Sequence, residues 1–293
     1  MDDISHALLI AAVFIVAGAT TYIPFAIIGA VVLDADILLM PFFRNDPKRF
    51  IYTHGGITHS ITGALTMATG AFLVLVAITG FVPWPVQSLP WWLVLLSVFT
   101  GSLSHVFFDY LAYPGIPVLY PFGERKYTLG VFAGPSLVVM AISLVFLVSF
   151  FLYGLPILSL LIYALTVTLF LMASGVIKVY VELTNRGRTI PHFNPLPLKW
   201  YILDEDADSY HLSGLVLPRS LTALRNFPKY TGITPAGTQH YLDLPDVRRL
   251  IYTSYIVITE RRDEYIVFSD PIRAEGFIRY PPDFKVVAVR AET

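Results

Sequence analysis

The stretch SITGALTMATGAFLVLVAITGFVPWPVQSLPWWLVLLSVFTGSLS, residues 60–104, contains no Asp, Glu, Lys, Arg or His. A helix of about 20 apolar residues crosses a hydrocarbon layer of about 30 Å, so this stretch is long enough to cross twice. Its proline-rich middle divides it into expected spans at about 61–81 and 90–112, with Trp84, Trp91 and Trp92 at interfacial depth. The stretch predicts a helical hairpin in a membrane.

The remainder of the N-terminal part has the same character. Residues 127–177 also contain no Asp, Glu, Lys, Arg or His, and YGLP at 153–156 divides them into spans near 133–153 and 156–178. Segments 5–20 and 22–40 are shorter, and we interpret them as a tight hairpin, although a single span is the alternative. The sequence predicts a mainly α fold in which residues 1–180 form a bundle of about six transmembrane helices.

The composition agrees with a membrane protein and narrows its chemistry. Hydrophobic residues make up 55% and charged residues 14% of the chain, and the mean hydropathy is +0.65, well outside the range of soluble domains. The absence of cysteine excludes disulfides and thiolate ligands. A net charge of −1 gives no field that would attract nucleic acid.

The basic residues predict an orientation. Arg44, Lys48 and Arg49 follow the second expected span, Arg125 and Lys126 follow the fourth, and Lys178 follows the sixth. Because basic loops stay on the cytoplasmic side, we expect a multi-pass inner (plasma) membrane protein with its C-terminal region in the cytoplasm.

Residues 198–293 read as a small soluble α+β domain behind a proline-rich linker at 181–197. We expect strands at 198–206, 210–217, 254–270 and 284–292, with a hairpin turn at Arg262 and Asp263. Short helices are expected at 219–227 and 245–252. The histidines of this region are scattered, so we expect ordinary surface or turn positions for them, and the sequence names no protein partner for the domain.

Seven ionisable residues are expected at one depth, at the same-side ends of the first four spans. They are His6, Asp34, Asp36, His54, His59, His105 and Asp109. Ionisable groups are costly in a membrane domain, so their convergence predicts a functional site. A buried hydrogen-bonded pair that stabilises the bundle is the alternative for His105 and Asp109.

Local spacing suggests how these residues meet. His105 and Asp109 are four apart and share a helix face, whereas Asp34 and Asp36 diverge by about 200° on a regular helix. Therefore the two aspartates bind different ions, or the helix ends at this point, or one of them supports a ligand residue instead of binding the ion itself. Gly55 and Gly56 allow a tight loop that brings both loop histidines to the site, and we expect the hydroxyl of Thr58 to cap the third span.

Four imidazoles and three carboxylates without sulfur suit zinc, with manganese or iron as alternatives, in a site of one to three ions. A metal-activated water near neutral pH predicts hydrolysis, and a membrane face suits a phosphoester, for example in a lipid. Arg125 and Lys126 are either anion contacts for it or merely topology-setting charges. A metal or proton transporter and a scaffold with a structural metal site are the other interpretations.

The motifs that carry these residues resemble the YdjM-like family of inner-membrane proteins, described as membrane-bound metal-dependent hydrolases. The shared elements are an early His (His6), LDAD with Asp34 and Asp36, HGGITHS at 54–60 and HVFFD at 105–109, followed by Gly115 and Pro121-Phe122. NPLPLKWYIL at 194–203 also looks like the longer members. Leu33 and Gly55 stand where the family pattern has Pro and Arg. The order of ligands is distantly similar to zinc-dependent phospholipase C and P1 nuclease, which implies phosphoester cleavage.

Overall fold

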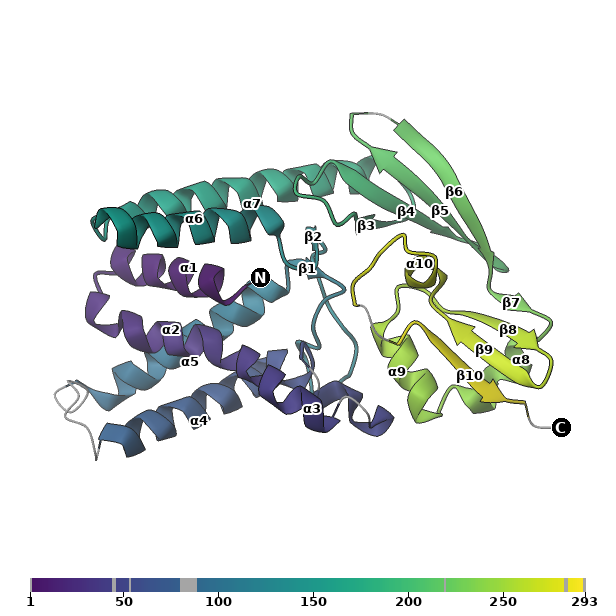
Figure 1. The fold of residues 1–293 in the computed structure, drawn as a ribbon, viewed down its shortest axis with the longest axis horizontal. Coiled ribbons are helices and arrows are strands. Elements are labelled where there is room, and N and C mark those ends of the chain that lie inside the picture. Colours follow the sequence, from purple (N-terminus) through teal and green to yellow (C-terminus); the bar gives the residue numbers. More distant parts are fainter. Residues whose placement is uncertain are drawn as a thin grey trace.

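A computed structural model describes residues 2–43, 46–52, 54–79, 89–218, 220–281 and 284–291. Arg44 and Trp84, used above for orientation and depth, lie outside these residues. The N-terminal part is helical, and the C-terminal part carries two sheets at one end of the helices (Figure 1). The expectation of a mainly helical membrane part followed by a smaller part with sheets is confirmed.

The helices of the first part run from residue 3 to residue 184. Their bounds are α1 Asp3–Val16, α2 Ile23–Val31, α3 Met40–Phe43, α4 Ile61–Thr79, α5 Trp91–Asp109, α6 Leu137–Tyr153 and α7 Ser159–Thr184. The described residues also form the 3-10 segments η1 Thr20–Tyr22, η2 Val32–Leu39, η3 Pro47–Tyr52 and η4 Ile57–His59. Two short parallel strands, β1 Ala112–Tyr113 and β2 Phe132–Ala133, follow α5.

Within the described residues, four helical segments are long and apolar enough to cross a membrane. They are Thr20–Phe43, Ile61–Ile78, Trp91–Asp109 and Ser159–Thr184. The helices at the other two expected spans, α1 and α6, have 14 and 17 residues. They rise only about 21 Å and 26 Å, which is less than a hydrocarbon layer of about 30 Å. The prediction of six spans is therefore not supported.

The two short helices are shorter than expected for local reasons. After Val16 the chain turns at Gly18, which has a φ of 68°, so α1 stops before the predicted end of its span. Ser136 caps the start of α6 and accepts a hydrogen bond from the Val139 amide, so this helix begins after the expected position of 133.

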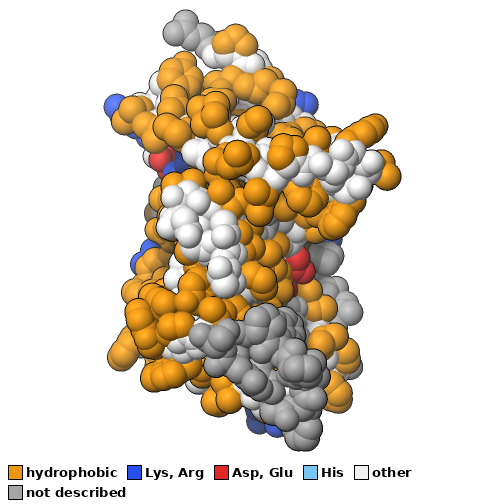
Figure 2. All heavy atoms as spheres, turned by 90° about the vertical axis from the view of Figure 1, so that its left-hand side faces the viewer, with side chains coloured by type: hydrophobic (Ala, Val, Ile, Leu, Met, Phe, Trp, Pro, Cys, Tyr) orange, Lys and Arg blue, Asp and Glu red, His pale blue; other side chains and the backbone are white. Residues whose placement is uncertain are grey.

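The membrane part is covered by apolar side chains. The face turned away from the sheets is dominated by hydrophobic groups (Figure 2), and the exposed side chains of α4, α6 and α7 include Leu73, Leu144 and Leu169. Such a surface suits lipid contact and not water. Inside, α1 packs on α6 and α7, while α2 packs on α4 and α5.

The tail contains two four-stranded sheets among its described residues. One has the order β3–β4–β5–β6, from β3 Arg188–Pro191, β4 Lys199–Glu205, β5 Ser209–Val216 and β6 Ser220–Pro228. The other has the order β10–β9–β8–β7, from β7 Tyr230–Thr231, β8 Ile258–Arg262, β9 Tyr265–Ser269 and β10 Val286–Arg290. The helical pieces are α8 Pro235–Thr238, η6 Gln239–Tyr241, α9 Pro245–Thr253 and α10 Pro271–Ala274.

The expected strands of the tail are present, and so is the helix at 245–252. The helix expected at 219–227 is wrong, because Ser220–Pro228 forms β6, paired with β5 along its whole length. Backbone pairing with a partner strand overrides the local helix propensity of Leu221, Ala223 and Leu224. The turn between β8 and β9 lies at Asp263 and Glu264, one residue later than expected. Part of the expected linker forms β3.

The tail contacts the membrane part near the end of α5. Tyr113 stacks on Tyr255 of the tail with ring centroids 5.1 Å apart and an interplanar angle of 7°. Glu124 forms an ion pair with Arg248 of α9 at 2.9 Å. These contacts place the sheets beside the helix ends that carry the predicted site residues.

Candidate metal centre

The site is built on the close approach of α2 and α5. A Cβ atom on Gly29 would lie 2.0 Å from the Val98 carbonyl oxygen, and one on Gly101 would lie 2.0 Å from the Ala26 carbonyl oxygen. Only glycine permits this backbone contact at both positions, as is common between membrane helices. His105, one turn beyond Gly101, consequently reaches the backbone of α2.

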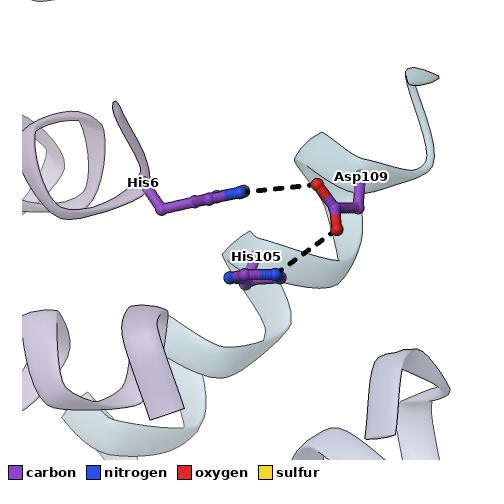
Figure 3. Close-up of side chains that lie close together, drawn as sticks. All are labelled: His6, His105 and Asp109. Carbon is purple, nitrogen blue, oxygen red and sulfur yellow. Dashed lines mark ion pairs between the residues drawn. The ribbon is translucent and has the colours of Figure 1, made fainter. Parts of the chain in front are cut away.

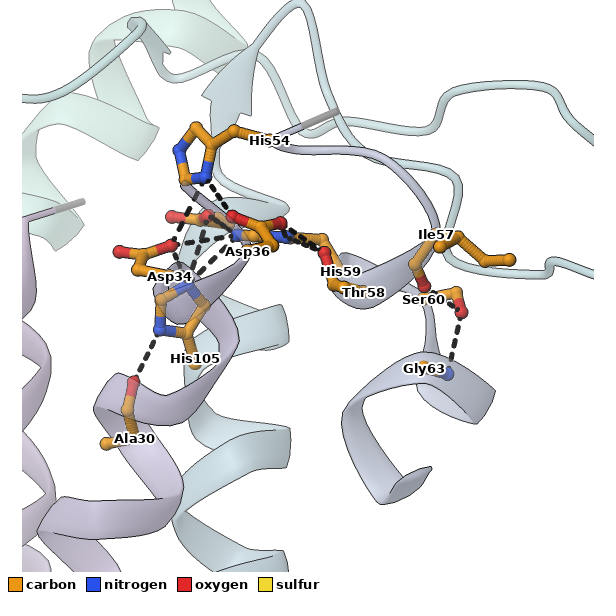
Figure 4. Close-up of polar contacts among 11 residues, drawn as sticks. Ala30, Asp34, Asp36, His54, Ile57, Thr58, His59, Ser60, Gly63 and His105 are labelled. Carbon is orange, nitrogen blue, oxygen red and sulfur yellow. Dashed lines mark hydrogen bonds and ion pairs between the residues drawn. The ribbon is translucent and has the colours of Figure 1, made fainter. Parts of the chain in front are cut away.

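The end of α2 explains how that backbone receives His105. The α-helix stops at Val31 and continues as the 3-10 segment η2. A carbonyl oxygen has two lone pairs, so the Ala30 carbonyl, next to the change from α-helix to 3-10 helix, can accept from a side chain as well as from the backbone. His105 Nδ1 lies 2.6 Å from that oxygen (Figure 4).

The loop that carries His54 and His59 has the tight geometry that its glycines predict. Gly55 adopts a φ of 73°, and no atom of the described residues lies within 4 Å of a Cβ built on it. The cap of α4, however, is Ser60, whose Oγ accepts from the Gly63 amide at 2.9 Å. Thr58 instead donates its hydroxyl proton to Asp36. The prediction that Thr58 caps the span is wrong.

The start of α1 is held by a buried polar chain. Asp2 caps the helix by accepting from the Ser5 amide at 3.1 Å. Ser5 Oγ lies 2.8 Å from Ser143 Oγ of α6, which lies 2.7 Å from the Tyr163 hydroxyl of α7. These bonds fix the rotation of α1 and so direct His6 toward α5.

The seven predicted residues are linked by successive contacts into one group. His59 Nε2 lies 3.3 Å from His105 Nε2 and 3.1 Å from Asp34 Oδ1. His105 Nε2 lies 3.4 Å from the same Asp34 oxygen. Asp109 Oδ2 lies 3.4 Å from both imidazole nitrogens. The pair of His59 and His105 thus contacts Asp34 and Asp109, and the four side chains come from three segments.

The remaining three residues flank this group. His54 Nδ1 lies 2.8 Å from Asp36 Oδ1, and His59 Nδ1 lies 3.5 Å from Asp36 Oδ2. On the other side His6 Nε2 lies 3.4 Å from Asp109 Oδ1 (Figure 3). The His6 ring stacks on His105 at 3.9 Å, and neither of its nitrogens has a hydrogen-bond partner among the described residues although the side chain is fully buried.

Hydrogen bonding assigns the protons of the two central imidazoles. The Ala30 carbonyl can only accept, so His105 Nδ1 carries the proton and Nε2 of the neutral ring has a free lone pair. Thr58 spends its one proton on Asp36, so its oxygen accepts from His59 Nδ1 at 3.0 Å. His59 Nε2 is then also unprotonated in the neutral ring, and two lone pairs face each other.

This arrangement fits a metal ion on geometric grounds. Donors about 2.0–2.1 Å from a common ion at tetrahedral angles lie about 3.3–3.4 Å apart, close to the 3.1–3.4 Å found here. Three overlapping donor groups are present among the described residues: His6–His105–Asp109, Asp34–His59–His105 and Asp36–His54–His59. His105 and His59 are the shared members.

Asp34 and Asp36, which would diverge on a regular helix, both contact His59. The imidazole lies between them, with Nε2 facing Asp34 and Nδ1 facing Asp36. Burial alone would lower the pKa of His59, but the hydrogen bonds to Asp34 and Asp36 outweigh it and raise that pKa overall. The carboxylates therefore attract a cation to this ring, whether a proton or a metal ion.

The sequence analysis did not identify the role of three residues beside the site. Asp3 shares a side-chain hydrogen bond with Asp34, and its position three residues before His6 was the available signal. Thr58 was named as a cap and instead orients His59. Tyr280 of the tail could not be found from the sequence, because only the tertiary fold brings it toward the site. Burial, followed by the charges of Asp109 and Asp34, raises the pKa of Tyr280.

The two predicted anion contacts lie apart from the donor groups. Arg125 and Lys126 line a cavity of about 870 Å³ between the loop after α5, the end of α7 and the tail. Tyr110, which directly follows Asp109, lines the same cavity. None of the histidines of the tail belongs to a donor group within the described residues.

Comparison with known proteins gives one match. No curated protein and no solved structure matches the chain. The family model described as YdjM inner membrane protein matches residues 1–201 of 293, which include all seven residues of the centre. The chain therefore belongs to the YdjM inner membrane protein family.

Proposed function

We propose that this membrane protein is a metal-dependent hydrolase of phosphoesters. The observation that carries the proposal is the facing pair of His59 Nε2 and His105 Nε2, 3.3 Å apart and flanked by Asp34 and Asp109. In their neutral forms both rings present lone pairs there, and the carboxylates beside them favour a cation between the rings. Imidazole and carboxylate donors without thiolate favour zinc, with manganese and iron as alternatives.

The residues of the centre divide into donors and supports. Asp34, His59 and His105 would hold one ion, while the groups His6–His105–Asp109 and Asp36–His54–His59 offer neighbouring positions. Ala30 and Thr58 orient the two central rings, as hydrogen-bond partners behind metal ligands commonly do. A bound divalent ion would supply a nucleophile near neutral pH by lowering the pKa of water.

The surroundings support a substrate at the membrane surface. The centre lies at the C-terminal end of α5 and just before α4, where two segments of spanning length end. His54 is the most exposed of the four imidazoles, at 31% of its side chain, so protons can exchange with water there. A phosphoester in a lipid is the substrate we propose, with the tail on the cytoplasmic side.

The test is metal content and turnover measured on the same samples. The detergent-purified protein should contain a transition metal by mass spectrometry and should cleave a chromogenic phosphomonoester or phosphodiester. His105→Ala and Asp109→Ala should lose both, whereas His211→Ala, a tail imidazole paired with Asp206 at 2.7 Å, should lose neither. Metal binding without any esterase turnover would favour the transporter or scaffold, and unchanged metal in both site variants would refute the centre.

A further inference from the structure

The cavity beside the metal centre has an unusual charge. Its volume of about 870 Å³ falls within the range of small-molecule sites. Six basic side chains line it, against two acidic ones. The basic residues are Arg125, Lys126, Lys178, Arg186, Arg188 and Arg248, and the acidic ones are Glu124 and Glu182.

Among the described residues, two of the six cations are paired with a carboxylate. Lys178 pairs with Glu182 at 2.6 Å, and Arg248 pairs with Glu124 at 2.9 Å. These two pairs use both acidic side chains of the lining. The cavity keeps four positive charges.

The other four cations have no carboxylate partner among the described residues. Lys126 Nζ lies 4.3 Å from the centre of the Tyr252 ring, and the Arg125 guanidinium lies 5.8 Å from that of Tyr127. Arg188 donates to the Tyr255 carbonyl. Aromatic rings and a carbonyl stabilise a cation but leave its charge uncompensated. A multivalent anion would compensate it.

Lys126 adds a second line of support. Its side chain is partly buried against the tail. Burial, followed by the charge of Arg273, lowers the pKa of Lys126 to about 8. A cation that is partly desolvated in this way is common where a protein binds an anionic ligand.

The position of the cavity suggests where the anion comes from. Lys178 and Glu182 lie in the last two turns of α7, at the end of a segment long enough to span the membrane. Tyr110 and Phe50, which also line the cavity, lie next to Asp109 and near His54. The cavity is thus at headgroup depth and adjoins the donor groups.

We propose that this cavity binds a ligand with two or more phosphate charges, held jointly by the membrane part and the tail. Guanidinium groups match phosphate oxygens in a two-pronged geometry. Arg125 lies in the loop after α5, whereas Arg186 lies between α7 and β3 and Arg188 is the first residue of β3. The site needs no hydrolysis at the metal centre. Its ligand is either a phosphorylated lipid headgroup or a soluble phosphate compound.

Binding of inorganic pyrophosphate to the full-length protein in detergent tests the proposal. Isothermal titration calorimetry should detect binding that persists in EDTA and in His105→Ala. The double variant Arg125→Gln/Arg186→Gln should bind at least about 10-fold more weakly, since each hydrogen bond to a charged group contributes that much or more. The matched control Arg225→Gln/Arg290→Gln removes two surface pairs elsewhere in the tail and should bind as the parent does.

A competition experiment separates the two sources. Phosphatidic acid in mixed micelles that displaces pyrophosphate, when phosphatidylcholine does not, identifies a lipid headgroup as the ligand. Pyrophosphate binding that resists phosphatidic acid identifies a soluble ligand. The proposal is overturned if pyrophosphate does not bind, if EDTA abolishes binding, or if the control variant weakens it as much as the cavity variant does.

Discussion

His105 Nδ1 and the carbonyl oxygen of Ala30 lie 2.6 Å apart, although 75 residues separate them in the chain. This contact decides which nitrogen of His105 is free to bind a cation. It depends on two features that contain no ionisable group: the glycines between α2 and α5, and the change from α-helix to 3-10 helix after Val31.

Gly101→Ala should weaken metal binding without altering a ligand. Its Cβ would lie 2.0 Å from the Ala26 carbonyl oxygen, so α5 must move away from α2 and carry His105 off Ala30. Overpacking of this kind costs about 1–3 kcal/mol. Metal content and melting temperature should both fall. Gly70→Ala on α4, where no atom lies within 4 Å of the new Cβ, should change neither.

Thr58→Val and Ser60→Ala should separate metal affinity from helix stability. Losing the Thr58 hydroxyl removes the acceptor for His59 Nδ1 and the donor to Asp36, and we expect metal affinity to fall about 10–100-fold. Losing Ser60 Oγ removes the cap of α4 at a cost of about 1 kcal/mol. Metal titration and thermal unfolding of both variants measure this. Equal affinities would mean that Thr58 does not orient His59.

Chelation should lower the melting temperature of the parent protein. An ion that binds only the folded state contributes about 2.7 kcal/mol at 100 times its dissociation constant. Asp34→Asn should melt at the same temperature with and without EDTA. Asp46→Asn, which breaks an exposed pair with Arg49 at 3.2 Å, should keep the full response to EDTA. A parent protein that does not respond to EDTA would contradict a bound ion.

Lys126→Met should raise stability at pH 7 while weakening pyrophosphate binding. The pKa of Lys126 falls from 10.5 to about 8 in the folded protein, so the unfolded chain binds more protons between pH 8 and 10.5. The contribution of Lys126 to the free energy of unfolding is therefore lowest below pH 8 and rises with pH between pH 8 and 10.5. The penalty that the variant removes is at most about 3 kcal/mol. Melting curves at pH 7 and 10 should differ less in the variant than in the parent.

Much of the site was predictable because its residue types are rare in their setting. His6, His105 and Asp109 stand in apolar segments, and their even depth followed from the span boundaries alone. The structure brings all seven predicted residues together, and their role as ligands stays a prediction. The prediction that His105 and Asp109 share one helix face is correct because both lie within one regular helix, α5.

The errors arose where the chain leaves regular structure. The predicted number of spans is not supported because a turn at Gly18 and a cap at Ser136 shorten α1 and α6, and hydropathy does not record helix ends. The segment at 220–228 was misread because a strand at the edge of a sheet takes its conformation from its partner, β5. Thr58 was misassigned because its partner, Asp36, is 22 residues away.

The sequence by itself determined the membrane character, the shortage of charge that makes seven residues conspicuous, and the exclusion of thiolate ligands. These are properties of composition and local order. Only the tertiary structure decided which imidazole nitrogens are free, how Asp34 and Asp36 share His59, and that four uncompensated cations line one cavity. Each of these depends on contacts between segments far apart in the chain, and the energies of such contacts are set by packing and not by neighbouring residues.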